Sequence, residues 1–198
     1  TIPHIIILGA GFGGLTLAQK LKGAPVRITL IDKRNFHLFQ PLLYQVAIAG
    51  LLPTQIAYPV RSIVRRQKNL TFQMGEVTKI DLNKRFVKME GSVIAYDTLV
   101  IAAGGQTNFF GLESVQKYGF ELKAVEHAVH TRNHMLSIFE RASREADMEK
   151  RRAMLTFIIA GAGPTGVETT GALAELIAHV MVKDFPAMRL DETRVLLL

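Results

Sequence analysis

Residues 4–14 read HIIILGAGFGG, and this stretch decides the expected fold. A mostly apolar, β-branched run is followed at once by glycines, which is typical of a buried strand in a parallel sheet. Residues 15–22 then suit a helix, and residues 26–31 (VRITLI) form a second apolar run that leads into Asp32. The segment therefore predicts a strand, a glycine turn, a helix and a second parallel strand.

The glycines of this turn have the spacing that lets a backbone approach a pyrophosphate. Gly9 permits the sharp exit from the strand, Gly11 has no Cβ to obstruct phosphates, and Gly14 lets the helix pack closely on the strand. The N–H groups that begin the next helix favour an anion. Asp32 lies 21 residues after Gly11, where a carboxylate can accept hydrogen bonds from ribose hydroxyls. The spacing predicts a dinucleotide site; the alternative is a glycine turn with a surface aspartate.

The same pattern recurs 152 residues after Gly9. An apolar run at residues 155–160 (LTFIIA) leads into Gly161, Gly163 and Gly166. A further apolar run occupies residues 195–198. The acidic residue that would follow this strand and distinguish NADH from NADPH lies outside this sequence. The repeat predicts two nucleotide-binding units.

The remaining residues predict the rest of the architecture. The expected elements are an aromatic and proline-rich connection (35–59), a helix (58–66), a strand (70–74), an antiparallel meander (76–96), a strand ending in small residues (98–102), one long helix (126–150) and a helix after the second turn (167–182). We therefore expect an α/β protein with two Rossmann-like dinucleotide-binding units, parallel sheets and a small antiparallel β-meander, the second unit being truncated.

Composition excludes several classes of protein. Of 198 residues, 48% are hydrophobic and 21% are charged, which is the balance of a globular protein rather than a disordered or fibrous one. Cysteine is absent, and this excludes disulfides, cysteine zinc sites and a redox-active disulfide. No stretch reaches the ~18–20 apolar residues of a membrane-spanning helix, and no signal peptide is expected.

The net charge of +7 suits a nucleic acid, an anionic membrane surface or a polyanionic cofactor. Nucleic acid is disfavoured because no exposed aromatic residues are expected among the basic ones. The basic groups within residues 61–68 and 150–152 are expected to be solvated. No metal site is expected, because His130 and His134 are four residues apart but no carboxylate cluster accompanies them.

Four segments together resemble type II NADH dehydrogenase, the non-pumping NADH:quinone oxidoreductase among the two-dinucleotide flavoproteins. They are NFHLFQPLLYQVA (35–47), YDTLVIAAGGQTNFFG (96–111), FELKAVEHAVHTRNHML (120–136) and AGAGPTGVETTGALAEL (160–176). Ala103 departs from the family pattern, which usually has threonine there. After Glu168 the family prefers an apolar residue, whereas this chain has Thr169 and Thr170. The resemblance covers the first half of the family, so we expect the chain to be an N-terminal fragment.

The resemblance implies which residues contact each cofactor. For FAD, the resemblance implies that the pyrophosphate is bound by Gly9, Gly11, Phe12, Gly13 and Gly14, and the adenosine ribose by Asp32 and Lys33. It implies that Val77 contacts the adenine, and that the isoalloxazine has as neighbours Pro41, Leu42, Ala103 and Gly104. For NADH it implies the second turn, namely Gly161, Gly163, Pro164, Thr165 and Gly166. Glu168 is implied to lie near the nicotinamide and to assist proton handling or nicotinamide binding; the alternative is an acid favoured by the helix dipole. The FAD-binding domain is expected at residues 1–118, and the connecting helix with the NADH-binding domain at residues 119–198.

The expected function is that of an FAD-dependent NADH:quinone oxidoreductase, which passes a hydride from NADH to the flavin and then two electrons to a quinone. The implied cofactors are FAD and NADH. The implied partners are a quinone and, through the C-terminal part, the cytoplasmic face of the cell membrane; the fragment alone is expected to be soluble. A homodimer is left open. Two alternatives are a soluble NAD(P)H-dependent flavin reductase with another acceptor and a non-catalytic nucleotide-binding fragment.

Overall fold

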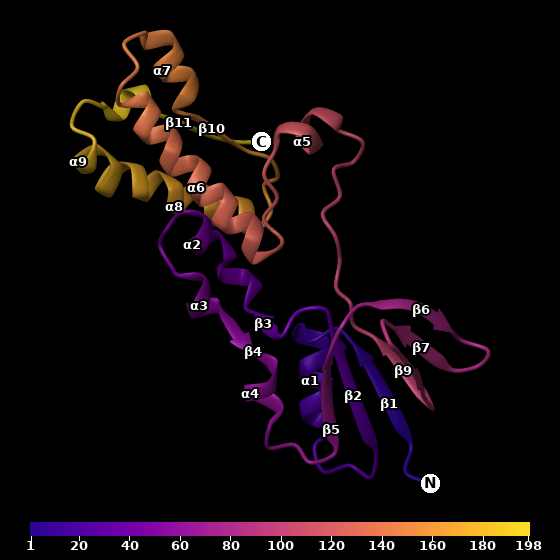
Figure 1. The fold of residues 1–198 in the computed structure, drawn as a ribbon. Coiled ribbons are helices and arrows are strands. Elements are labelled where there is room, and N and C mark those ends of the chain that lie inside the picture. Colours follow the sequence, from indigo (N-terminus) through magenta and orange to yellow (C-terminus); the bar gives the residue numbers. More distant parts are fainter. The chain divides into compact units, whose positions relative to one another are not determined.

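A computed structural model describes residues 1–198 of the chain, which divide into two compact units (Figure 1). The first unit contains Thr1–Leu38 and Ala57–Gln106, and the second contains Phe39–Ile56 and Thr107–Leu198. Each unit is therefore built from two separate pieces of the chain. The predicted domains, FAD-binding at residues 1–118 and NADH-binding after them, are defined by the nucleotide that each would bind. This division stays a prediction.

The first unit is mainly β-structure. Its elements are β1 (His4–Leu8), α1 (Phe12–Lys20), β2 (Arg27–Asp32), β3 (Phe36–Leu38), β4 (Ala57–Pro59), α4 (Val60–Val64), β5 (Leu70–Met74), β6 (Val77–Asp81), β7 (Phe86–Met89), β8 (Ser92–Ala95) and β9 (Thr98–Ile101). The second unit is mainly helical. Its elements are a short 3₁₀ turn η1 (Gln40–Leu42), α2 (Leu43–Ala47), α3 (Pro53–Ile56), α5 (Glu113–Tyr118), α6 (Val125–Ala142), α7 (Met148–Met154), β10 (Thr156–Ile159), α8 (Pro164–Leu176), a π-helical turn η2 (Ile177–Met181), α9 (Val182–Asp184), η3 (Leu190–Glu192) and β11 (Arg194–Leu197).

A four-stranded parallel sheet forms the centre of the first unit, with the strand order β5-β2-β1-β9. Strand β1 lies inside the sheet, and its Ile6 and Ile7 have no exposed surface. Ile28 and Leu30 of β2 are equally buried. Consecutive apolar residues are needed here because both faces of a parallel sheet are covered. The predicted α/β class and the parallel strand pair are confirmed.

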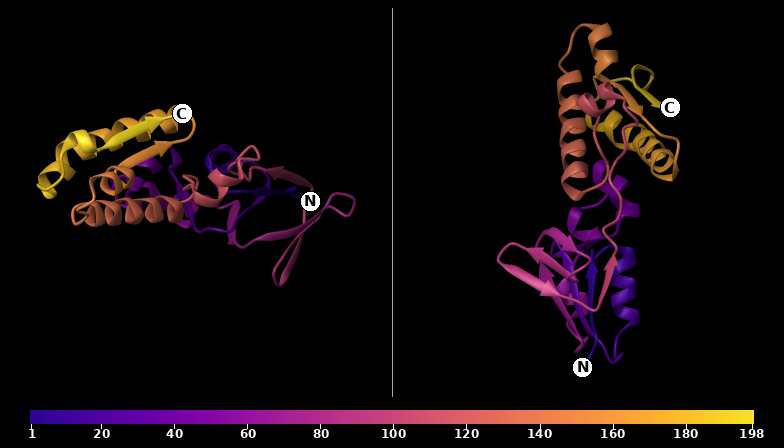
Figure 2. Two further views of the ribbon diagram at one scale, coloured as in Figure 1. Left: turned by 90° about the horizontal axis from the view of Figure 1, so that it is seen from above. Right: turned by 90° about the vertical axis from the view of Figure 1, so that its right-hand side faces the viewer.

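Different elements cover the two faces of this sheet. Helices α1 and α4 pack on one face, where Leu15, Ala18 and Val60 join the core. The meander β6–β7–β8 packs on the other face, where Val87 and Met89 are buried. The right-hand view of Figure 2 shows α1 and the meander on opposite sides of the sheet.

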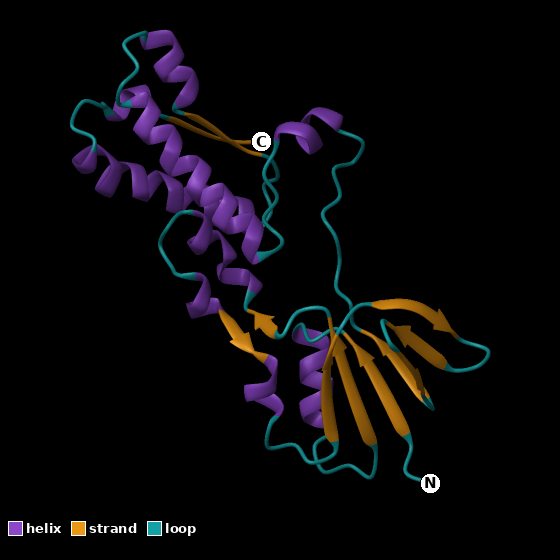
Figure 3. Cartoon of the chain, viewed as in Figure 1, coloured by secondary structure: helices purple, strands orange, loops and turns teal.

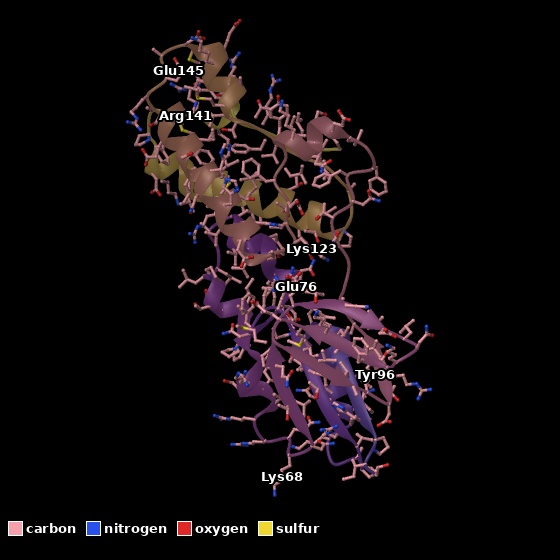
Figure 4. The ribbon with its side chains drawn as sticks, turned by 45° about the vertical axis from the view of Figure 1, so that its right-hand side comes forward. Lys68, Glu76, Tyr96, Lys123, Arg141 and Glu145 are labelled. Carbon is pink, nitrogen blue, oxygen red and sulfur yellow. The ribbon has the colours of Figure 1, made fainter.

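The meander predicted for residues 76–96 is confirmed. Strand β7 pairs antiparallel with both β6 and β8. Tyr96 closes the meander, since its N–H donates to the Arg85 carbonyl at 2.9 Å and its ring is buried (Figure 4). The phenol hydroxyl donates to the Asp81 carbonyl at 3.4 Å. The apolar ring thus joins the core while its polar end keeps a partner.

The second unit contains a two-stranded parallel sheet of β10 and β11 that helices cover on one face (Figure 3). Phe157 of β10 contacts Phe139 of α6, with ring centroids 5.5 Å apart. Leu173 of α8 and Ile177 belong to the same buried cluster. Strand, glycine turn, helix and parallel strand therefore occur in this unit too, as the repeat predicts.

The single helix predicted for residues 126–150 is wrong. Helix α6 ends at Ala142, and α7 begins at Met148. Figure 4 labels Arg141, in the last turn of α6, and Glu145, in the loop between the two helices. The carboxylate of Asp147 accepts the N–H groups of Glu149 at 2.9 Å and of Lys150 at 3.2 Å. Such an N-cap begins a new helix. The charged residues here favour helix formation, but they form two helices instead of one. The connection predicted for residues 35–59 also contains short elements, from β3 to β4.

His4 is a buried polar residue at the amino end of β1. Its Nδ1 lies 2.8 Å from the Ala95 carbonyl, and its Nε2 lies 2.8 Å from the Thr29 hydroxyl. A carbonyl only accepts, so Nδ1 donates and Nε2 accepts from the hydroxyl. Burial, and after it the charge of Arg27, lowers the pKa of His4; the bond to Ala95 and the charge of Asp97 oppose this shift in part.

The lowered pKa of His4 predicts a loss of stability in acid. The unfolded ring takes up a proton near its ordinary pKa of about 6.5, whereas the folded ring resists it. The contribution of His4 to the free energy of unfolding should therefore have its full value above pH ~6.5 and decrease as the pH drops below that value. Urea unfolding of the wild type and of His4→Gln between pH 5 and 8 measures this, since the substitution removes the titrating ring. Equal pH slopes for the two proteins would contradict the prediction.

No helix of the chain combines the length and the apolar character required to cross a membrane.

Candidate nucleotide-binding sites

The first glycine turn, residues 9–14, joins β1 to α1 and requires glycine at two positions. Gly9 has φ of +103°, and a Cβ there would lie 2.2 Å from the Ala102 carbonyl oxygen. A Cβ on Gly14 would lie 1.9 Å from the Gly9 carbonyl oxygen. The turn is therefore shaped by contact with β9 on one side and with its own helix on the other.

Gly11 is different, because no atom of the protein lies within 4 Å of a Cβ built on it. Its φ of −73° and ψ of −167° are also open to any residue. Neither the fold nor the backbone conformation therefore requires glycine here. Gly11 is also the N-cap of α1, with no side-chain cap, and the first turn of α1 has no acidic residue. An open cradle at the positive end of a helix suits a phosphate.

Asp32 ends β2 and holds the first glycine turn. Its Oδ2 accepts the Ala10 N–H at 2.7 Å, and its Oδ1 accepts the Arg34 N–H at 2.9 Å. Each oxygen retains a second lone pair for another donor. Lys33, the adjacent candidate, is exposed. The carboxylate thus has a structural task in addition to the ribose contact that the resemblance implies.

The other candidates of the first unit lie at the same edge of the sheet. The Ala102 N–H donates to the Leu8 carbonyl at 2.7 Å, so Ala103 and Gly104 directly follow the paired end of β9. The Gly75 N–H donates to the Asp32 carbonyl at 2.9 Å, which brings Val77, the first residue of β6, to this edge. Figure 4 shows Glu76 there. The carboxyl edge of a parallel sheet is where ligands bind in α/β proteins.

The second glycine turn, residues 161–166, repeats the first in the positive φ of its first glycine, its open central glycine and its closely packed last glycine. Gly161 has φ of +110°, and a Cβ on Gly166 would lie 1.9 Å from the Gly161 carbonyl oxygen. Gly163, like Gly11, has no atom within 4 Å of a Cβ built on it. The Gly161 N–H donates to the Leu198 carbonyl at 2.8 Å, as the Gly9 N–H donates to Ile31 at 2.7 Å. Both turns therefore present the same open cradle.

Helix α8 begins directly at the second turn. Pro164 occupies its first position, where a missing N–H costs nothing. Thr165 and Glu168 are exposed. The Thr169 hydroxyl donates to the Thr165 carbonyl at 2.6 Å and the Thr170 hydroxyl to the Gly166 carbonyl at 2.7 Å. These threonines, which depart from the family pattern, are accommodated by bonding to their own helix.

Pro41 and Leu42 belong to the second unit, unlike the other residues expected near the flavin. They lie in η1, which leads into α2. Pro41 is exposed and Leu42 is half-buried. In the same unit Lys123 (Figure 4) donates to the side chain of Gln40 at 3.4 Å, beside these residues.

His37 contacts the first glycine turn, although the sequence analysis did not predict it as a site residue. Its Nδ1 lies 3.0 Å from the Ala10 carbonyl oxygen. Its ring meets the Phe12 ring edge-on, with centroids 5.1 Å apart and an interplanar angle of 85°. No sequence spacing signals this contact, because it depends on how β3 runs beside the turn.

The other histidines and the basic cluster have plainer surroundings. His130 and His134 both contact the Phe120 ring, with centroids 5.1 and 4.6 Å apart. No group of three or more His, Asp or Glu side chains is arranged to hold a metal ion. Arg61 lies over the Phe72 ring at 5.1 Å, and Lys68 projects from the loop before β5 (Figure 4). The basic side chains within residues 61–68 are exposed, as expected. The expectation is wrong for Arg151 of the second basic group, because its guanidinium pairs with the buried carboxylate of Glu192 and donates to the Ala187 carbonyl at 2.6 Å.

Two curated proteins that resemble this chain are quinone oxidoreductases by name. The chain is 42% identical over 199 residues to the type II NADH:quinone oxidoreductase Ndh of Mycobacterium tuberculosis, covering 98% of this chain and 43% of that protein. It is 30% identical over 206 residues to the external alternative NAD(P)H-ubiquinone oxidoreductase B4, mitochondrial, of Arabidopsis thaliana, covering 98% and 35%. The chain thus spans about two fifths of the length of these relatives.

Solved structures agree with this fold. NDH2 from Plasmodium falciparum in complex with NADH matches with a TM-score of 0.89 and 26% identity, over 100% of this chain and 42% of that one. The sulfide:quinone oxidoreductase of Aquifex aeolicus shares the fold, with a TM-score of 0.67. The family model described as pyridine nucleotide-disulphide oxidoreductase matches residues 3–192. This match over most of the chain, together with the two glycine turns, shows that the chain belongs to the pyridine nucleotide-disulphide oxidoreductase family.

Proposed function

We propose that this chain carries the FAD site and the NADH-binding turn of an FAD-dependent NADH:quinone oxidoreductase. The observation that carries the proposal is the pair of matching glycine turns, each with an open central glycine at Gly11 or Gly163. Two dinucleotides are what an NADH-dependent flavoprotein must hold. The names of the relatives, which are NADH:quinone and NAD(P)H-ubiquinone oxidoreductases, support the choice of reaction.

The residues of the first unit fit FAD. The space beside Gly11, which a Cβ would enter, allows the backbone to approach the pyrophosphate. In our proposal residues 9–14 bind the pyrophosphate, Asp32 and Lys33 bind the adenosine ribose, and Val77 contacts the adenine. Ala103 and Gly104 of the same unit lie beside the isoalloxazine in this proposal, and the contacts implied for Pro41 and Leu42 of the second unit stay a prediction. When bound, FAD supplies a hydride acceptor that passes electrons on in pairs.

The second turn fits NADH by the same physical reasoning. Gly161, Gly163 and Gly166 allow close approach, and Pro164 and Thr165 begin the helix whose N–H groups face the phosphates. In our proposal Glu168 binds or orients the nicotinamide. Hydride transfer needs no acid–base pair, so the task of these side chains is to orient the two dinucleotides.

We also propose the acceptor and its place. A quinone accepts the electrons, because both curated relatives described above are named for a quinone or ubiquinone. Long-chain quinones are lipid-soluble, so the enzyme works as a peripheral protein at the cytoplasmic face of the cell membrane. The homodimer stays a prediction.

Flavin absorbance tests the proposed function. The purified protein should bind FAD, show the yellow flavin band near 450 nm and lose this band when NADH is added anaerobically. Adding menadione, a soluble quinone, should restore the colour and allow steady NADH oxidation. A protein that bleaches with NADH and reduces a dye but no quinone would support the flavin reductase. A protein that stays colourless with excess FAD would contradict the proposal and favour a non-catalytic nucleotide-binding role.

A matched pair of variants on α8 tests the role of Glu168. Glu168→Gln should retain FAD but bleach several-fold more slowly with NADH, because the amide removes the carboxylate charge and an acceptor at the nicotinamide. Glu175→Gln is the control, since Glu175 is exposed on the same helix farther from the glycine turn. Equal bleaching rates in the two variants would favour the helix-dipole explanation for Glu168.

A further inference from the structure

Two side chains form hydrogen bonds with the backbone of Ala10 in the first glycine turn. The Ala10 N–H donates to Asp32 Oδ2 at 2.7 Å, and the Ala10 carbonyl lies 3.0 Å from His37 Nδ1. Ala10 is itself buried, with 1% of its surface exposed. Asp32 belongs to the expected nucleotide motif, whereas His37 has no part in it. The bond from His37 therefore needs its own explanation.

The chemistry of this bond settles where its proton lies. A carbonyl oxygen accepts and cannot donate, so Nδ1 of His37 carries the hydrogen. Neutral histidine then leaves Nε2 without a proton. In a trans peptide the C=O and the following N–H point in opposite directions. Holding the Ala10 carbonyl toward His37 therefore directs the Gly11 N–H away from the imidazole.

The Gly11 N–H is the group that this bond orients. It donates to no backbone or side-chain acceptor of the protein, and the space beside Gly11 is open to 4 Å. The same residue caps the start of α1, where the helix dipole favours a negative charge. A pyrophosphate oxygen is the acceptor that such a free N–H suits.

The position of the His37 ring is itself determined by packing. His37 is the central residue of β3 and pairs with Tyr58 of β4 in an antiparallel register. Its ring is edge-on to Phe12, the first residue of α1. The imidazole is thus held from its backbone and from its ring, which reduces the rotamer entropy that the bond to Ala10 must offset.

We propose that His37 is a positioning residue of the first nucleotide site. Its Nδ1–H holds the Ala10 carbonyl and so aims the Gly11 N–H at the pyrophosphate of the bound dinucleotide. This inference rests on the proposed FAD site, and it adds a residue that acts on the ligand through the backbone. Preorganised donors bind more tightly because the ligand does not have to order them.

Two substitutions of His37 separate the hydrogen bond from the ring. His37→Phe keeps a ring against Phe12 and removes the donor, whereas His37→Asn offers an amide N–H near the place of Nδ1. FAD affinity is measured by the change in flavin fluorescence on binding. The dissociation constant should rise about tenfold in His37→Phe and by less than about twofold in His37→Asn. Thermal unfolding of both variants checks that the fold is retained.

Nitrogen-15 NMR of the histidine rings provides a measurement that does not depend on FAD or on a variant. In the wild-type protein at neutral pH, His37 should carry its proton on Nδ1, the less common tautomer of a free imidazole. A ring protonated on Nε2 alone would overturn the inference, because its Nδ1 could not donate to the Ala10 carbonyl.

The binding results overturn it in two further ways. Equal FAD affinity in the wild type and His37→Phe would show that the bond does not matter. A larger loss in His37→Asn, which lacks the ring, than in His37→Phe would assign the effect to ring packing. In either case the wild type still binds FAD, so the proposed function stands. A wild type that binds no FAD refutes the proposed function and the inference with it.

Discussion

Replacing Gly11 by valine is expected to abolish FAD binding while leaving the fold intact. The Gly11 backbone is extended, and no atom lies within 4 Å of its Cβ position, so valine fits the free protein. The loss of a favourable N-cap residue should cost no more than about 1 kcal/mol of stability. The side chain would instead occupy the space that the pyrophosphate needs, and FAD affinity should fall about 100-fold or more. Flavin content after purification and a thermal melt measure the two effects.

Gly163→Val is the matched control for this experiment. Gly163 occupies the same position in the second turn and has the same open surroundings. In our proposal it faces NADH, so this variant should retain its flavin and require a much higher NADH concentration for bleaching. If Gly11→Val keeps a full complement of flavin, the assignment of FAD to the first turn is wrong. If Gly163→Val loses its flavin, the two assignments must be exchanged.

Replacing Gly14 by alanine should instead destabilise the fold. The added Cβ would lie 1.9 Å from the carbonyl oxygen of Gly9, and this oxygen is backbone and cannot rotate away. Either α1 moves off β1 or the turn is rearranged, and we expect a loss of about 3 kcal/mol. The midpoint of urea unfolding measures this loss in the protein without FAD, so that ligand binding does not contribute.

Gly13→Ala is the control for helix propensity. It is in the same helix, but its Cβ would meet only the Ala102 Cβ, at 4.0 Å. Alanine is a better helix former than glycine, so this variant should gain about 0.5–1 kcal/mol. Similar midpoints for Gly13→Ala and Gly14→Ala would show that the close packing of α1 on β1 does not contribute as we infer.

The contrast among these glycines shows how far sequence reasoning reaches. The spacing of Gly9, Gly11 and Gly14 predicted a turn with three distinct tasks. The structure agrees for Gly9 and Gly14, which contact backbone, and leaves the space beside Gly11 empty of protein atoms. The sequence alone could not show that Gly9 contacts the Ala102 carbonyl oxygen, because this contact joins residues far apart in the chain.

The prediction of one long helix at residues 126–150 was wrong for a local reason that helix propensity alone does not show. Most residues of 143–150 suit a helix, but Asp147 caps α7 through two backbone N–H groups. Aspartate in this position competes with helix continuation. A capping residue within a charged stretch is therefore a signal that a periodicity argument underweights.

The sequence by itself determined the presence of two glycine turns, the parallel pairing around each of them and the antiparallel meander. These features follow from local patterns, namely apolar β-branched runs, glycine spacing and alternation in the meander. The tertiary structure alone decided that His37 and Asp32 hold Ala10 from two sides. Those contacts join residues 22 and 27 positions apart in the sequence. They depend on strand order, register and side-chain packing, which no local pattern contains.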